Sequence, residues 1–279
     1  MPGAEQQHRE FDRETSDVAH KPSAPLVATT SRLGVPVRLI KRASLRPAPP
    51  YGAAYAKLLP VAQAGDANAQ YSLGLLLYEC RDIPADAPAM ERVIDSVHQT
   101  HTRDGWDVGD PGEEERMLRS RFAECAGVPG EARSQYRDWL KRAADAGLVE
   151  AELDLPLRLP PGKWCQFLSE CSPQQRAEQE ALQKEAMDYV GRARDAGSAQ
   201  ALWTFGAWYE QGEAVPEDDV EAYANFLALE EINAAAGQPQ RFGAMLEALR
   251  ARLRPVDLDR AEQRARELLS NPNCCVLTP

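Results

Sequence analysis

Three short stretches of this 279-residue chain decide its fold: residues 64–74 (AGDANAQYSLG), 146–156 (AGLVEAELDLP) and 196–206 (AGSAQALWTFG). All three fit the pattern Ala-Gly-x-x-x-Ala-x-x-x-apolar-Gly, except that Pro156 replaces the last glycine of the second copy. Such self-similarity indicates a repeat protein, in which each copy is one small unit of structure. The repeat-defining residues are Gly65, Ala69, Gly74, Gly147, Ala151, Gly197, Ala201, Gly206 and Gly212.

The spacing around the first glycine predicts a pair of helices in each copy. Leu58 and Val61 lie seven and four residues before Gly65, so they share one helix face. The glycine then ends that helix, because glycine adopts the left-handed conformation of a C-terminal cap at little cost. Ala69 and Leu73 share a face of the next helix. Each unit is therefore a helical hairpin that buries its apolar face only by stacking on its neighbours.

Helix-favouring residues dominate the chain from residue 51 onward, and strand patterns are scarce. The 82 residues between Gly65 and Gly147 leave room for one degenerate unit, with helices near 87–100 and 113–125. Further helices are expected after Pro216. We predict an all-α, short right-handed α-solenoid of about four to five hairpins over residues 51–279.

Residues 1–50 differ from the rest of the chain. They hold eight Lys and Arg against five Asp and Glu, and seven of the 21 prolines, with little helical periodicity. We predict a disordered N-terminal leader. The alternative, a targeting segment, lacks the apolar run of about 7–15 residues of a secretory signal peptide.

The charge of the chain limits its partners. Its net charge is −11, so the residues after the basic leader carry −14. An acidic body repels phosphates, which argues against nucleic-acid binding. No window of 18 apolar residues predicts a transmembrane segment. The charge favours a protein partner with a basic surface.

Residues 193–229 (ARDAGSAQALWTFGAWYEQGEAVPEDDVEAYANFLAL) resemble a Sel1-like repeat (SLR), a relative of the tetratricopeptide repeat. The resemblance implies a helical hairpin repeat that binds other proteins, often in bacterial signalling or envelope systems and sometimes as an immunity protein. The matching residues are Ala196, Gly197, Ala201, Phe205, Gly206, Tyr209, Gly212, Val215, Asp218, Ala222 and Phe226, whereas Ala214 stands where the family usually has glycine.

From these features we predict a non-enzymatic protein–protein interaction module, an adaptor or inhibitor, whose groove is lined by successive first helices. The alternatives are a hydrolase with a site between repeats, for example β-lactam-related, and a purely structural envelope protein. The sequence contains no GxSxG, SxxK, HExxH, P-loop or GxGxxG motif, so we expect no cofactor and no catalytic residue. His98 and His101, with Glu91 and Asp95 nearby, fit a solvated helix face better than a metal site.

The expected binding residues are Trp203, Trp208, Tyr209, Glu217 and Asp218. Exposed aromatic residues on a groove are strong contact points, although core packing is the alternative for each. We expect Trp203 in the core and Trp208 facing outward. Glu217 and Asp218 precede a predicted helix, where their default role is to stabilise its N-terminus.

Six cysteines leave two alternatives open: free thiols in a reducing compartment, or disulfides in an oxidising one, which we favour slightly as an extracytoplasmic location. The SLR resemblance raises the disulfide option. Cys80 with Cys125, and Cys165 with Cys171, are the expected pairs, although Cys80 and Cys125 could also be small buried apolar residues. The adjacent Cys274 and Cys275 are expected not to bond to each other, because the ring would be strained.

Overall fold

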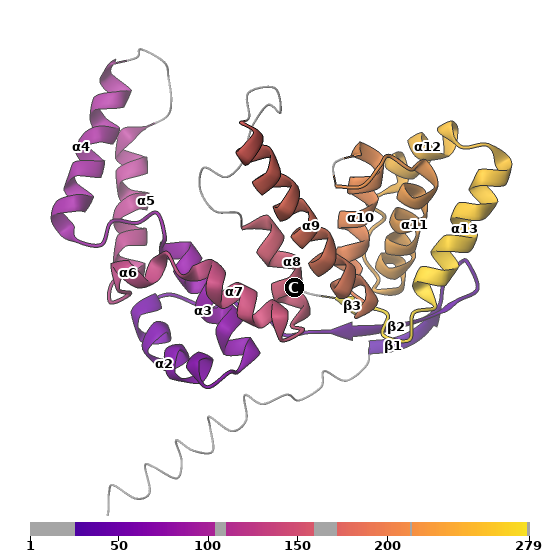
Figure 1. Cartoon of the computed structure of the whole chain (residues 1–279), viewed down its shortest axis with the longest axis horizontal. Helices are drawn as coiled ribbons and strands as arrows, with labels where there is room; N and C mark the ends of the chain where they lie inside the picture. The colour runs from indigo at the N-terminus through magenta and orange to yellow at the C-terminus, as the bar shows by residue number, and fades with distance from the viewer. Residues whose placement is uncertain (1–25, 104–109, 159–171, 213, 278–279) are drawn as a thin grey trace, which may run out of the picture.

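The computed structural model describes residues 26–103, 110–158, 172–212 and 214–277. The predicted α-solenoid is confirmed: four helical hairpins follow one another from one end of the molecule to the other, and a last helix packs against them (Figure 1). The hairpins are α2 (Tyr51–Gln63) with α3 (Ala67–Cys80), α7 (Tyr136–Asp145) with α8 (Val149–Leu157), α9 (Pro173–Asp195) with α10 (Ala199–Gln211), and α11 (Asp219–Ala235) with α12 (Gly243–Arg252), and the last helix is α13 (Pro255–Leu269).

The turns inside the hairpins share one backbone geometry. Gly65, Gly147 and Gly197 have φ values of 98°, 82° and 88°, as their predicted role as C-terminal caps requires. At each turn the glycine N–H donates to the carbonyl three residues earlier, and the next N–H donates to the carbonyl five residues earlier. Gly237 has a φ of 69° and makes the same two bonds. It therefore marks a fourth unit, which the sequence pattern does not reveal.

Stacking places the second helix of one hairpin against the first helix of the next. Helix α3 packs on α7, α8 on α9, and α10 on α11. Two of these contacts need the last glycine of the repeat. A Cβ at Gly74 would lie 2.8 Å from the side chain of Leu140, and one at Gly206 would lie 2.8 Å from the ring of Phe226. Those glycines therefore allow the helices to cross closely.

The second repeat copy departs from the pattern at Pro156, and its second helix is short. Helix α8 spans nine residues and ends at Leu157, whereas α3 spans 14 and α10 spans 13. Proline lacks the N–H that would continue the helix, so a short helix is the expected result.

Helices α4 (Ala87–Arg103) and α5 (Pro111–Glu124) pack against each other and stand away from the stack (Figure 1). We predicted these two helices but placed them in the solenoid as a degenerate repeat. That placement is wrong, because α3 packs directly on α7 and leaves no space for a unit between them. The pair is a lateral insertion, followed by the short helix α6 (Gly130–Arg133).

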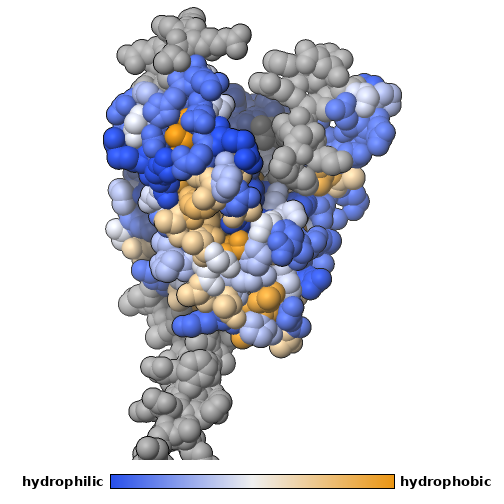
Figure 2. Space-filling view, turned by 90° about the vertical axis from the view of Figure 1, so that its left-hand side faces the viewer, coloured by the Kyte–Doolittle hydropathy of each residue, from blue (hydrophilic) through white to orange (hydrophobic). Residues whose placement is uncertain are grey.

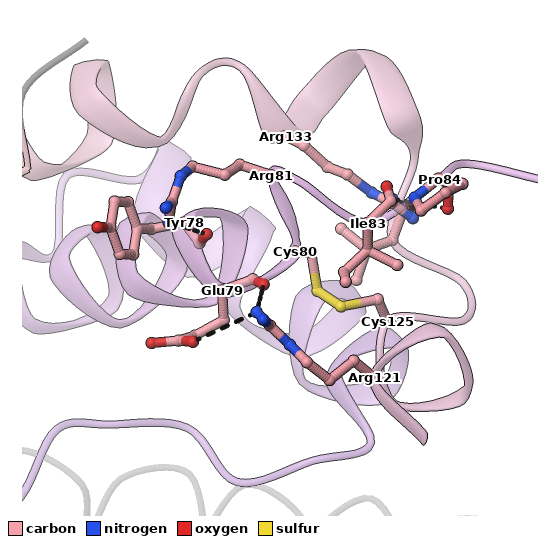
Figure 3. The surroundings of a disulfide bond; sticks show 10 residues. Tyr78, Glu79, Cys80, Arg81, Ile83, Pro84, Arg121, Cys125 and Arg133 are labelled. Atoms are coloured by element: carbon pink, nitrogen blue, oxygen red, sulfur yellow. Dashed lines mark hydrogen bonds and ion pairs between the residues drawn. A yellow bond between two sulfur atoms is a disulfide. The ribbon is translucent and has the colours of Figure 1, made fainter. Parts of the chain in front are cut away.

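A disulfide joins the two ends of this insertion. Cys80 and Cys125 are bonded, 45 residues apart in sequence and both buried, which confirms the first expected pair (Figure 3). Beside them the buried Arg133 donates to the carbonyls of Ile83, Pro84 and Val128, which lie at both ends of the insertion. The base of the insertion is therefore held covalently and by hydrogen bonds.

The other four cysteines give a mixed outcome. Cys165 and Cys171 lie outside the described residues, so their expected pairing stays a prediction. Cys274 and Cys275 are joined as a vicinal disulfide, against our expectation that adjacent cysteines do not bond. The described part of the chain therefore has no free cysteine.

The predicted disordered leader is ordered from residue 26. Strands β1 (Leu26–Thr30) and β2 (Pro36–Lys41) form an antiparallel hairpin, and β2 pairs in parallel with β3 (Val276–Leu277) at the other end of the sequence. The strands run along the side of the C-terminal helices (Figure 1). Residues 1–25 lie outside the described ranges.

Burial and charge explain why this basic segment is ordered. Val37 and Leu39 alternate with exposed Arg38 and pack into a core cluster with residues of α10, α11 and α13. Glu231 on α11 is only 2 % exposed, and it accepts hydrogen bonds from the backbone N–H (2.6 Å) and the Nε (2.7 Å) of Arg32. The acidic body thus binds its own basic leader.

Replacing Arg32 with alanine should loosen the β1–β2 hairpin without unfolding the solenoid. The change removes one charge-assisted hydrogen bond and leaves the buried Glu231 carboxylate less satisfied, a loss of about 1–3 kcal/mol. Hydrogen exchange of the β2 amides should therefore quicken by about tenfold or more. Arg38→Ala, which removes an exposed charge from the same hairpin, is the control. Equal exchange rates in the two variants would contradict the role of Glu231.

The first helix of the solenoid carries little charge on its surface. Helix α2 carries a single charged residue, Lys57, and its exposed positions include Ala53, Pro60 and Val61. Figure 2 shows apolar residues over the lower part of this end, below a mostly hydrophilic upper part. The first helix thus lacks the polar outer face usual for a terminal repeat.

Among the described helices, none has the length and apolar character needed to cross a bilayer.

Candidate functional site

Equivalent positions of the repeats form the wall of one pocket. Tyr71, Leu153 and Trp203 each lie six residues after the first glycine of their unit, on helices α3, α8 and α10. All three line a pocket of about 320 Å³. The stacking of the hairpins therefore brings one repeat position of three units to the same pocket, which we call the groove.

An extended segment of the chain itself closes one side of this groove. We call residues 42–50, between β2 and α2, the strap. The backbone carbonyl of Leu45 accepts a 2.7 Å hydrogen bond from Ser72 Oγ on α3, and the Leu45 side chain packs on the core. Arg42 donates through Nη1 to Glu150 Oε2 on α8 at 3.0 Å. The strap residues that line the pocket are Ala43, Ser44, Leu45 and Arg46.

The polar groups of the pocket wall are partly satisfied within the wall. The hydroxyl of Tyr71 donates to Asp154 Oδ2 at 2.7 Å, and Arg158 pairs with the same oxygen at 3.3 Å. Burial and the adjacent Asp154 carboxylate raise the pKa of Tyr71 far above its usual value. Tyr71 therefore stays a protonated donor, and Asp154 is engaged by two groups.

Glu150 also lines this pocket, and its carboxylate is only partly satisfied. Its side chain is 7 % exposed, and Oε2 accepts from Arg42. The other oxygen, Oε1, is buried and has no hydrogen-bond partner among the described residues. A buried carboxylate oxygen normally accepts a hydrogen bond, so Oε1 is an acceptor that the described residues leave unused.

The structure places Trp203 and Trp208 differently from our expectation. Trp203 is 42 % exposed and lines the pocket, whereas we expected it in the core. Trp208, expected to face outward, is half-buried and packs edge-on against Phe205 with ring centroids 5.4 Å apart. Tyr209 stacks on Phe205 at 6.2 Å, and burial raises the pKa of its hydroxyl. Trp203 and Trp208 are five residues apart, so they cannot share one helix face.

The predicted acidic pair lies in the turn before α11 and does not line the pocket. Asp218 caps α11, because its carboxylate accepts from the N–H groups of Val220 (2.9 Å) and Glu221 (3.1 Å). Glu217 is exposed and packs beside Gly212. Of the five expected binding residues, only Trp203 lies in the pocket. The helical residues of this pocket come from second helices, so the expectation that first helices line a binding groove stays a prediction.

His98 lies in a group of ionic contacts between helices α4 and α5 of the insertion. His98 Nε2 lies 2.9 Å from Glu115 Oε2, and Arg119 holds both Glu115 and Glu91. These hydrogen bonds lower the pKa of both glutamates. The His101 side chain lies outside the described residues. In the described ranges, no group of three or more His, Cys, Asp or Glu could hold a metal ion.

Sequence reasoning missed the strap and the acidic residues of the pocket. A signal for the latter existed, because Glu150 and Gln200 are equivalent positions three residues after the first glycine, and Asp154 and Thr204 are equivalent seven residues after it. All four line the pocket with Trp203. A comparison of the polar repeat positions, in addition to the apolar ones, would have placed these four residues together.

The fold and the groove define a helical-repeat protein with a pocket between second helices and an extended strap. No family model and no curated protein match the chain. Among solved structures it is similar to the crystal structure of c5321, a protective antigen present in uropathogenic Escherichia coli strains that displays an SLR fold. The identity is 18 % and the TM-score 0.36, over 78 % of this chain. The chain spans about half (48 %) of the length of that protein.

Proposed function

We propose that this chain is a non-enzymatic protein–protein interaction module of SLR type, and that its groove binds an extended segment of another protein. The observation that carries the proposal is the strap. Its extended backbone already lies against the second helices through the Ser72–Leu45 hydrogen bond and the Arg42–Glu150 ion pair. A groove that holds one extended segment has the shape and the polar groups to bind another.

The charge of the body supports a basic partner. Two buried carboxylates, Glu150 and Glu231, each bind an arginine of the leader. The residues after the leader carry a net charge of −14. A basic segment of another protein would meet the same attraction.

The hydrolase alternative has less support. A hydrolytic site would pair a serine or histidine with a carboxylate inside a pocket. The residues that line the groove pocket include Ser44 and Thr204 but no histidine, and its Asp154 is engaged by Tyr71 and Arg158. The pocket is instead lined by two aromatic residues, Tyr71 and Trp203, as an interaction site would be.

The more specific role that we propose is that of an adaptor or inhibitor in a bacterial envelope. The most specific form of this proposal is an immunity protein. The Cys80–Cys125 disulfide supports an oxidising, extracytoplasmic location. A purely structural envelope protein is the alternative. An adjacent toxin gene, whose product binds this chain in a purified mixture, would favour the immunity protein.

Trp203 provides the direct test of the groove. We expect Trp203→Ala to weaken binding of the partner by about 2 kcal/mol, or about 30-fold, because exposed tryptophans in a groove are frequent hot spots. The melting temperature should stay unchanged, since the side chain is 42 % exposed. The partner is first isolated by pull-down and mass spectrometry, and its affinity for each variant is then measured by calorimetry.

A matched control is Met117→Ala, an exposed apolar residue on α5 and away from the groove. Its affinity should equal that of the unchanged protein. If Met117→Ala weakens binding and Trp203→Ala does not, the partner binds the insertion and the groove proposal is wrong.

A further inference from the structure

Glu150 gives the groove pocket a specific chemistry. We propose that the pocket receives one cationic side chain, a lysine or arginine of the bound segment, and that Glu150 is its acceptor. This inference rests on the proposed function and names the chemistry of the partner at one position. It is carried by the geometry of Glu150, the pocket wall and the pairs that the leader already makes.

The carboxylate of Glu150 is incompletely satisfied. It is 7 % exposed, and the structure gives it one hydrogen bond, from Arg42 to Oε2. Oε1 is buried without a partner in the described chain. A carboxylate can accept about four hydrogen bonds, and donors that carry charge satisfy it best. The residue lines the pocket, so a donor that enters the pocket can reach this side chain.

The leader shows that buried glutamates of the helical body bind arginine, once in the turn between β1 and β2 and once on the extended strap. At Glu231, both carboxylate oxygens accept from Arg32, one from Nε and one from the backbone N–H. At Glu150, only one oxygen is used, by Arg42. The two sites are alike in burial and in their arginine partner, and they differ in that the second has capacity left.

The apolar wall suits the stem of a long cationic side chain. Leu153, Leu157 and Trp203 line the pocket, and Leu157 is 71 % exposed. Lysine and arginine lay their methylene groups along such surfaces, and their charged ends are attracted to the face of tryptophan. The pocket volume of about 320 Å³ leaves room for such a side chain.

Arg46 on the strap is a cation in the pocket lining and opposes a second cation. Its side chain is exposed, so it can turn toward solvent when a ligand enters. Removing the charge of Arg46 therefore distinguishes a cationic ligand from an anionic one. Arg46→Gln should tighten binding of a cationic side chain, whereas it should weaken binding of a carboxylate.

The test is selection of peptides from a random heptapeptide library on the full chain. We expect the enriched peptides to share one basic position. Replacing that residue with citrulline, which keeps the shape of arginine without its charge, should weaken binding to the unchanged protein by about tenfold or more. The same replacement should have little effect on Glu150→Gln. The matched control is Glu231→Gln, which removes the other buried carboxylate that binds an arginine of the leader and should keep the citrulline effect.

The outcomes separate the two proposals. Enriched peptides without a basic position, or weaker binding to Arg46→Gln, would overturn the cation inference and leave the binding groove standing. If the enriched peptides bind Trp203→Ala as tightly as the unchanged protein, both the cation inference and the binding groove are overturned. The absence of any enriched peptide would also overturn both. If Glu150→Gln does not fold, the citrulline exchange and Arg46→Gln still decide the question on folded protein.

Discussion

Replacing Phe226 with alanine is expected to lower the free energy of unfolding by about 3–5 kcal/mol. Phe226 is fully buried on α11, where it covers Gly206 of α10 and stacks on Phe242 with ring centroids 5.7 Å apart. Removing the ring leaves a cavity at the junction of two hairpins, and each hairpin of a solenoid depends on its neighbours. Urea denaturation followed by circular dichroism measures the loss.

The adjacent Leu227 provides the control for this change. It is half-buried, so Leu227→Ala should cost clearly less than Phe226→Ala. Gly206→Ala provides a second test, because a Cβ there would lie 2.8 Å from the Phe226 ring. Its cost should fall when Phe226 is first changed to leucine, since the two residues are in contact and their effects couple. A cost below about 1 kcal/mol for Phe226→Ala would contradict this account of the junction.

The solenoid could be predicted because its turns and crossings require particular residues. A C-terminal cap requires a positive φ, and a close helix crossing requires a missing side chain, so both leave glycines in the sequence. Gly237 shows the limit of this reading. It makes the same turn, but the residues after it lack the repeat pattern, because α12 begins six residues later, at Gly243.

The ordered leader could not be predicted from composition, because its partners are distant in sequence. Strand β2 pairs with Val276 and Leu277, and Arg32 pairs with Glu231, 199 positions away. A local signal was present in the alternation of Val35, Val37 and Leu39 with polar or proline residues. The proline content and positive charge of the same segment point instead to disorder.

The site was predicted only in part for a related reason. The exposed face of a helix depends on which helix packs on the other side, and this is a tertiary contact. Trp203 and Trp208 lie on one helix, and only the packing of α10 on α9 and α11 decides which of them is exposed. The pairing of the strap with Glu150 is a contact of the same kind.

Removing the Cys80–Cys125 disulfide is expected to cost about 4 kcal/mol in the free energy of unfolding. The bond closes a loop across 45 positions, and the loss of chain entropy in the unfolded state predicts a value of this size. The double variant Cys80→Ala with Cys125→Ala tests it by urea denaturation without a reducing agent. The insertion should also lose protection from hydrogen exchange in α4 and α5, because its ends are no longer joined.

The vicinal pair supplies the control, because Cys274→Ala with Cys275→Ala removes a disulfide that closes almost no loop. By the same entropy argument its loss should cost much less than 4 kcal/mol. The insertion provides a further distinction, since α4 and α5 should keep their protection in this control. Equal losses in both double variants would show that the stability comes from the buried side chains and not from joining the ends of the insertion. The exchange pattern of α4 and α5 therefore decides whether Cys80–Cys125 acts as the covalent base of the insertion.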